Sequence, residues 1–96
     1  MTTATPPRER VSRGTGSRTG GAWRVIVLND NHNTFEGVAF ALAATLPGVT
    51  YQQGLRLADR IHSAGRSIVW SGHRELAELY WSQLESQGLT MAPLES

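Results

Sequence analysis

Apolar side chains between residues 23 and 96 recur first with the spacing of a strand, then with that of two helices, a strand, a helix and a final strand. Turn-forming residues separate these segments, and the links between them are short. Elements in this order bury their apolar faces when the helices lie against a small sheet. We therefore predict an α+β two-layer sandwich, in which three helices cover one face of a three-stranded antiparallel sheet in the order β-α-α-β-α-β.

A polar loop separates the first strand from the first helix. Residues 23–28 are mostly β-branched or apolar, as in a buried strand, and they stop at Asn29-Asp30-Asn31-His32-Asn33. Asn33 followed three residues later by Glu36 has the spacing of a capping box. This pattern predicts a helix over 34–46, which Pro47-Gly48 ends.

Similar signals place the remaining elements. Thr50 with Gln53 repeats the capping spacing, and Gly65 stands where a left-handed C-terminal cap belongs, so a second helix is predicted between them. A strand, a helix and a last strand are then predicted at 66–71, 72–87 and 89–94. Pro93 cannot donate to a strand ladder, so the last strand is expected to be an edge strand or to end near it.

Residues 1–22 have a different composition from the rest of the chain. They are rich in Gly, Ser, Thr, Pro and Arg, and Val11 is their single large aliphatic side chain. Such a segment cannot offset the entropy of ordering. We predict a flexible N-terminal extension at 1–22, with an organelle transit peptide as the alternative, and a folded domain at 23–96.

Composition limits the classes of function. The chain has no cysteine, which excludes disulfides and thiolate chemistry and fits a reducing, cytoplasmic location. No apolar run is long enough to cross a membrane. Residues 23–96 contain five arginines and seven acidic residues, a net charge of −2, which argues against nucleic-acid binding. A domain this small also favours binding over a deep catalytic cleft.

The loop 29–33 is the strongest local signal for a site. Its composition alone favours an ordinary strand-to-helix turn, because turns use the same residue types. His62 falls on the apolar face of the second predicted helix and is expected to point toward the core, where a lone histidine is usually structural. Asp30, His32 and His62, with His73, leave open a small metal-dependent hydrolase, although no pair has a recognised ligand spacing.

Three segments in sequence order resemble one protein family. They are VIVLNDNHNTFEGVAFAL, ADRIHSAGRSIVW and HRELAELYWSQLESQGLT. The ClpS family of Clp protease adaptors has a strand ending in L-N-D-D, a T-x-M-E or N-x-M-E helix start, a V-H-x-x-G helix end and an A-E helix. The resemblance covers residues 23–96, and it implies the ClpS fold and an adaptor without catalysis, metal or other cofactor.

The resemblance also implies a receptor for N-degrons, the bulky N-terminal Leu, Phe, Tyr or Trp of substrate proteins. By the family pattern, the α-amine is bound by Asn29, Asp30, Asn31 and His62. An α-ammonium offers three donors, which suits an amide oxygen and a neutral imidazole. The apolar pocket is expected to be lined by Asn33, Phe35, Val38, Ala58, Ile61 and Leu89.

The chain departs from the family pattern at the pocket. Asn31 replaces a second aspartate; its amide oxygen can still accept a hydrogen bond from the amine, but the charge of a carboxylate is lost. Phe35 replaces a gating methionine, and Ala58 replaces a long methionine on the second helix. Asn31 and Phe35 motivate an alternative function, a divergent ClpS-like regulator of a Clp chaperone without N-degron recognition.

The implied partners are a Clp AAA+ unfoldase and substrate proteins or peptides that carry N-degrons. Glu75 matches a family position that docks on the N-domain of the unfoldase, whereas Tyr80 stands in place of a neighbouring family lysine. The family uses a flexible N-terminal extension during delivery, and residues 1–22 fit this role.

Overall fold

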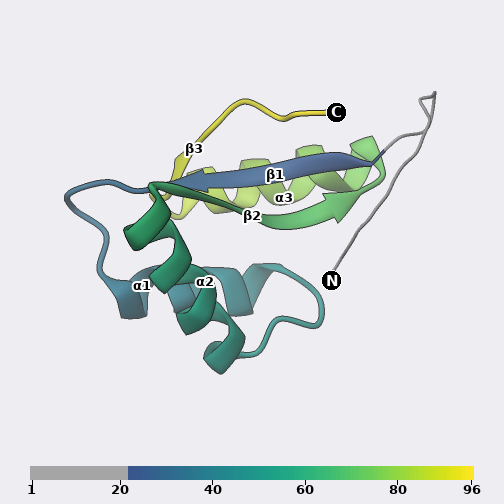
Figure 1. The fold of residues 1–96 in the computed structure, drawn as a ribbon. Helices are drawn as coiled ribbons and strands as arrows, with labels where there is room; N and C mark the ends of the chain where they lie inside the picture. Colours follow the sequence, from purple (N-terminus) through teal and green to yellow (C-terminus); the bar gives the residue numbers. More distant parts are fainter. Residues whose placement is uncertain (1–21) are drawn as a thin grey trace.

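The computed structural model describes residues 22–96, and Figure 1 shows how their elements are arranged. The elements in chain order are β1 (Trp23–Leu28), α1 (Phe35–Thr45), α2 (Tyr51–Ala64), β2 (Arg66–Gly72), α3 (Arg74–Ser86) and β3 (Thr90–Met91). This order and the antiparallel sheet confirm the predicted α+β fold. The predicted extension at 1–22 lies outside the described residues, except for Ala22.

The sheet has the strand order β2-β1-β3, so β1 is central and both neighbours are antiparallel to it. The β1–β2 register runs from Trp23 opposite Gly72 to Leu28 opposite Arg66, with an irregularity between Val25 and Ile26. The third strand is shorter than the predicted 89–94; it lies at the edge of the sheet and ends before Pro93, as expected. Beyond it, an isolated bridge pairs Arg24 with Glu95, and the C-terminal segment follows β1 (Figure 1).

Local signals explain most helix ends. The capping box of Thr50 and Gln53 is present, and Gly65 adopts the left-handed conformation with φ 88° after α2, as predicted. The third helix begins at Arg74 and not at Gly72, which is still paired with Trp23 in the sheet. A Cβ atom at Gly72 would lie 2.5 Å from the ring of Trp70, so this ring occupies the space that a side chain at position 72 would need.

One apolar core joins the sheet to all the helices. Val25 and Val27 point to the same face of β1 and are fully buried in one cluster with Leu42 of α1, Ala58 of α2 and Leu84 of α3. The helices therefore cover the same face of the sheet, as predicted.

Helices α1 and α2 cross at very close range. Gly54 of α2 is buried, and a Cβ atom built on it would lie 2.6 Å from the backbone oxygen of Ala39 in α1. Real Cβ atoms do not approach so closely, so this crossing requires glycine. Glycine thus sets the separation of the two helices that face the candidate site.

Candidate functional site

The predicted pocket residues meet at one cavity of about 230 Å³. The cavity lies where the β1–α1 loop faces α2 and the connection after α3. All ten residues predicted to contact the amine or line the apolar pocket lie on its wall: Asn29, Asp30, Asn31, Asn33, Phe35, Val38, Ala58, Ile61, His62 and Leu89. Tertiary folding therefore unites residues from three separate parts of the sequence.

The start of the loop is attached to the end of α2. The backbone N–H of Asn29 donates to the carbonyl oxygen of Gly65 at 2.9 Å. Gly65 is the C-terminal cap of α2, and His62 lies in the last turn of that helix. This hydrogen bond brings Asn29 to the end of the helix that carries His62, so both side chains reach the same cavity.

Asp30 shapes the loop from within. One carboxylate oxygen, Oδ1, accepts hydrogen bonds from the backbone N–H groups of His32 at 3.0 Å and Asn33 at 2.8 Å. Turns typically contain an aspartate whose side chain accepts hydrogen bonds from the backbone N–H groups two and three residues further along the chain. Burial raises the pKa of the Asp30 carboxyl, but hydrogen bonds from Asn33, Thr90 and His32 outweigh it and hold the pKa well below its usual range. Asp30 is therefore a carboxylate at neutral pH.

Asn33 does not cap α1, contrary to the prediction. The N-cap is Thr34, whose hydroxyl oxygen accepts from the N–H of Gly37 at 2.9 Å. The amide of Asn33 instead donates to Asp30 and to the carbonyl oxygen of Gly88. Both residues suit a cap, but the tertiary contact to Gly88 occupies the Asn33 side chain and leaves the role to its neighbour.

Three polar side chains at the cavity are open to solvent. Asn29, Asn31 and His62 are exposed, although all three lie on the cavity wall. His62 therefore lies at the cavity mouth. The prediction from its apolar helix face, that it points toward the core, is wrong. The ring of Phe35 meets the imidazole edge-on, with 5.4 Å between ring centroids and an interplanar angle of 77°. Phe35 therefore restricts where the imidazole can lie.

The inner wall of the cavity is apolar and comes from three elements. Val38 lies on α1, Ala58 and Ile61 lie on α2, and Leu89 follows α3. All four are buried side chains of the main core cluster. Packing of the core therefore keeps this wall in shape without a ligand.

Sequence reasoning missed several residues at the site. Val27, Leu28 and Thr34 also line the cavity. Val27 and Leu28 are the last residues of the strand before the polar loop. Their place next to this loop was a signal that could have predicted them at the cavity. Thr90 acts on the site through Asp30, 60 residues away in sequence, and no local pattern indicates this contact.

The residue predicted to bind the partner lies outside the cavity. Glu75 is exposed in the first turn of α3 and is not part of the cavity.

Within residues 22–96, no group of three or more His, Asp or Glu side chains is placed to hold a metal ion, so the set of Asp30, His32 and His62 does not form such a group. No helix in the same range is long and apolar enough to span a membrane.

Comparisons with known proteins agree with this architecture. A family model described as ATP-dependent Clp protease adaptor protein ClpS matches residues 18–95. The ATP-dependent Clp protease adapter protein ClpS of a Nostoc species is 47% identical over 94 residues, 98% of this chain and 94% of the relative. Its counterpart from a Synechocystis species is 49% identical over 73 residues, 76% of this chain and 74% of the relative.

A solved structure has the same fold. The structure of Agrobacterium tumefaciens ClpS2 bound to L-phenylalaninamide superimposes with a TM-score of 0.73 at 23% sequence identity. The match covers 80% of this chain and 98% of that one.

Proposed function

Because the chain belongs to the ClpS family of adaptors of the ATP-dependent Clp protease, we propose that it binds N-degrons and delivers them to a Clp AAA+ unfoldase. Proteins of this family are adaptors and not enzymes.

The observation that carries the proposal is the division of one cavity into a polar mouth and an apolar interior. Hydrogen-bonding side chains gather at the mouth, whereas the inner wall consists of Val38, Ala58, Ile61 and Leu89. Pockets for drug-sized ligands usually measure about 300–1,000 Å³. A cavity of about 230 Å³ suits one bulky amino-acid side chain, with the rest of the peptide outside.

The polar mouth suits a free α-amine. An ammonium group has three donors and no acceptor, so its site must supply oxygen atoms or lone pairs. Asn29, Asn31 and a neutral His62 each supply one, and all three are open to solvent at the cavity. An acetylated N-terminus has one donor and no charge, so it loses most of this interaction.

The Agrobacterium relative supports the same chemistry. Its ligand, L-phenylalaninamide, combines a free α-amine with an aromatic side chain. We infer that this chain likewise accepts N-terminal Leu, Phe, Tyr or Trp. Phe35 gives the mouth of the cavity a rigid aromatic edge in this protein.

We assign docking on the N-domain of the unfoldase to the start of α3. Glu75 is exposed there, and Leu76 and Leu79 on the same helix expose large apolar side chains. Glu75 and Leu79 are four residues apart and are neighbours on the helix surface. An acidic residue beside exposed leucines offers a partner both a charge and apolar area.

A peptide panel tests the proposed ligand. The protein should bind fluorescent peptides that begin with Leu, Phe, Tyr or Trp, and it should not bind the same peptides after N-acetylation. His62→Ala should weaken binding at least tenfold. His73→Ala is the matched control, because His73 is exposed, lies outside the cavity and makes no side-chain cap.

Equal affinity for free and acetylated peptides would exclude an amine receptor and favour the regulator that acts on the Clp chaperone without N-degron recognition. Docking is tested separately with a reporter that carries N-terminal Leu, degraded by the Clp protease. Glu75→Ala should slow degradation without changing peptide affinity, and Glu85→Ala at the far end of α3 serves as its control.

A further inference from the structure

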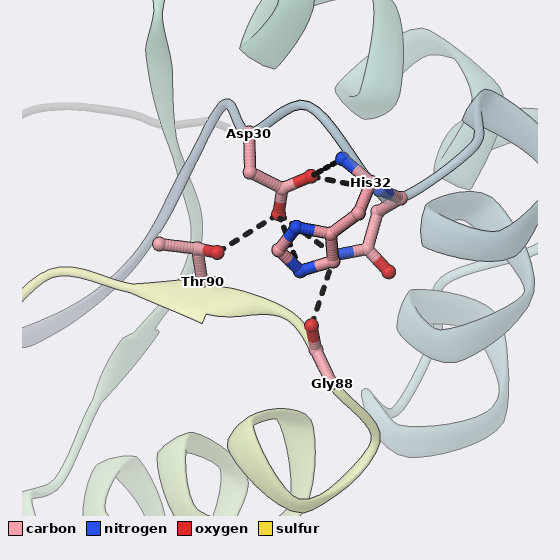
Figure 2. A network of polar contacts seen from close by, with 5 residues as sticks. Asp30, His32, Gly88 and Thr90 are labelled. Atoms are coloured by element: carbon pink, nitrogen blue, oxygen red, sulfur yellow. Dashed lines mark hydrogen bonds and ion pairs between the residues drawn. The ribbon is translucent and has the colours of Figure 1, made fainter.

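The carboxylate of Asp30 has no lone pair left for a ligand. Its second oxygen, Oδ2, accepts from the side-chain amide of Asn33 at 2.7 Å and from the hydroxyl of Thr90 at 2.8 Å, in addition to the two backbone bonds on Oδ1. A carboxylate has about four acceptor positions. The Asp30 side chain is only 12% exposed, and Figure 2 shows it directed toward the loop and Thr90.

Asn33 is occupied in the same way. Its Nδ2 group has two protons; one is donated to Asp30 and the other to the carbonyl oxygen of Gly88 at 2.9 Å. Asp30 and Asn33 thus hold each other, and each reaches across to the connection that follows α3.

The two points of attachment lie on either side of Leu89. Gly88 is held through its carbonyl oxygen and Thr90 through its hydroxyl, so the residue between them cannot shift independently of the loop. Leu89 is buried and forms part of the apolar wall of the cavity. Gly88 has a φ of 95°, which lets the chain turn sharply at this point.

We propose that Asp30 and Asn33 form a clamp on residues 88–90 that fixes the apolar wall at Leu89 relative to the amine acceptors Asn29, Asn31 and His62, and that Asp30 does not itself bind the ligand. The inference rests on the proposed function and changes the roles that the family pattern implied for two residues. Asp30 and Asn33 become positioning residues. The three exposed acceptors then match the three donors of an α-ammonium.

Thr90 provides the test because it touches the clamp and does not line the cavity. Thr90→Val removes the hydroxyl and keeps the β-branched shape, whereas Thr90→Ser keeps the hydroxyl. Thr90→Val should weaken binding of a free N-terminal Leu peptide about fivefold at a temperature where both variants are folded, and Thr90→Ser should restore affinity to within twofold of the parent.

A double-mutant cycle separates the clamp from a purely structural role. If Thr90 acts through Asp30, the effect of Thr90→Val on peptide affinity should largely vanish in the Asp30→Asn background. If Asp30 binds the amine directly, the two substitutions should have independent effects. Unchanged or tighter binding by Thr90→Val, or independent effects, would overturn the proposal.

The methyl NMR signals of Leu89 supply a measurement that needs no ligand. They should shift in Thr90→Val and return toward the parent positions in Thr90→Ser. If the parent protein binds no free N-terminal peptide, the proposed function fails, and the clamp is still judged by these signals. Leu89 signals that do not respond to Thr90→Val would refute the clamp in either case.

Discussion

The close crossing of α1 and α2 makes Gly54→Ala the most direct link between packing and the site. Alanine favours a helix over glycine by about 1 kcal/mol, so helix propensity alone predicts a gain in stability. The new Cβ, however, would lie 2.6 Å from the oxygen and 3.0 Å from the Cα of Ala39, both backbone atoms. Ordinary contact begins at 3.4 Å, so full relief of the clash with the oxygen takes a shift of 0.8 Å, the difference between 3.4 and 2.6.

Overpacking of this kind costs typically about 1–3 kcal/mol, and we expect the upper end of that range because the atoms that the Cβ meets are backbone atoms, which cannot rotate away. After the gain in propensity, we expect a net loss of about 2 kcal/mol. In a domain of this size the loss corresponds to a fall in melting temperature of about 10 °C. Peptide binding should weaken as well, because Val38 on α1 moves away from Ala58 and Ile61 on α2, which form the facing wall.

Urea unfolding and thermal melting followed by circular dichroism measure this loss. Gln52→Ala is the control, since Gln52 is exposed on the same helix and its replacement changes propensity without a clash. The control should be as stable as the parent or slightly more stable. A Gly54→Ala protein as stable as the parent would refute the view that this crossing requires glycine.

Three further predictions concern the loop and the extension. Asn31→Asp should tighten binding of free N-terminal peptides by about 1 kcal/mol, roughly fivefold, because a carboxylate adds an attraction to the ammonium that the neutral amide lacks; unchanged affinity in titration calorimetry would contradict this. Because hydrogen bonds depress the pKa of Asp30, its contribution to stability is full above the unfolded value of 3.8 and is lost as pH falls below it. Urea unfolding below that pH should therefore show a smaller acid-induced loss for Asp30→Asn than for the parent. Deleting residues 2–17 should preserve the fold and peptide affinity but slow delivery to the protease, and loss of either affinity or fold would move the domain boundary.

Much of the fold follows from local rules, and these were visible in the sequence. The strand at 23–28, the capping box of Thr50 with Gln53 and the left-handed cap at Gly65 depend on residues within a few positions of one another. The cavity wall was predicted through family resemblance, and folding brings those residues together.

Tertiary structure decided the points where two local solutions compete or where no local signal exists. Asn33 and Thr34 both suit the N-cap of α1, and the contact of Asn33 with Gly88, 55 residues away, selects Thr34. Helix propensity alone disfavours Gly54, and only the backbone of Ala39 packed against it explains why glycine is needed there. Periodicity and capping act within a few residues along the chain, whereas these choices depend on distances across the core. The sequence by itself therefore determined the order of elements and the chemistry at the cavity, and packing decided which of those side chains remain available to a ligand.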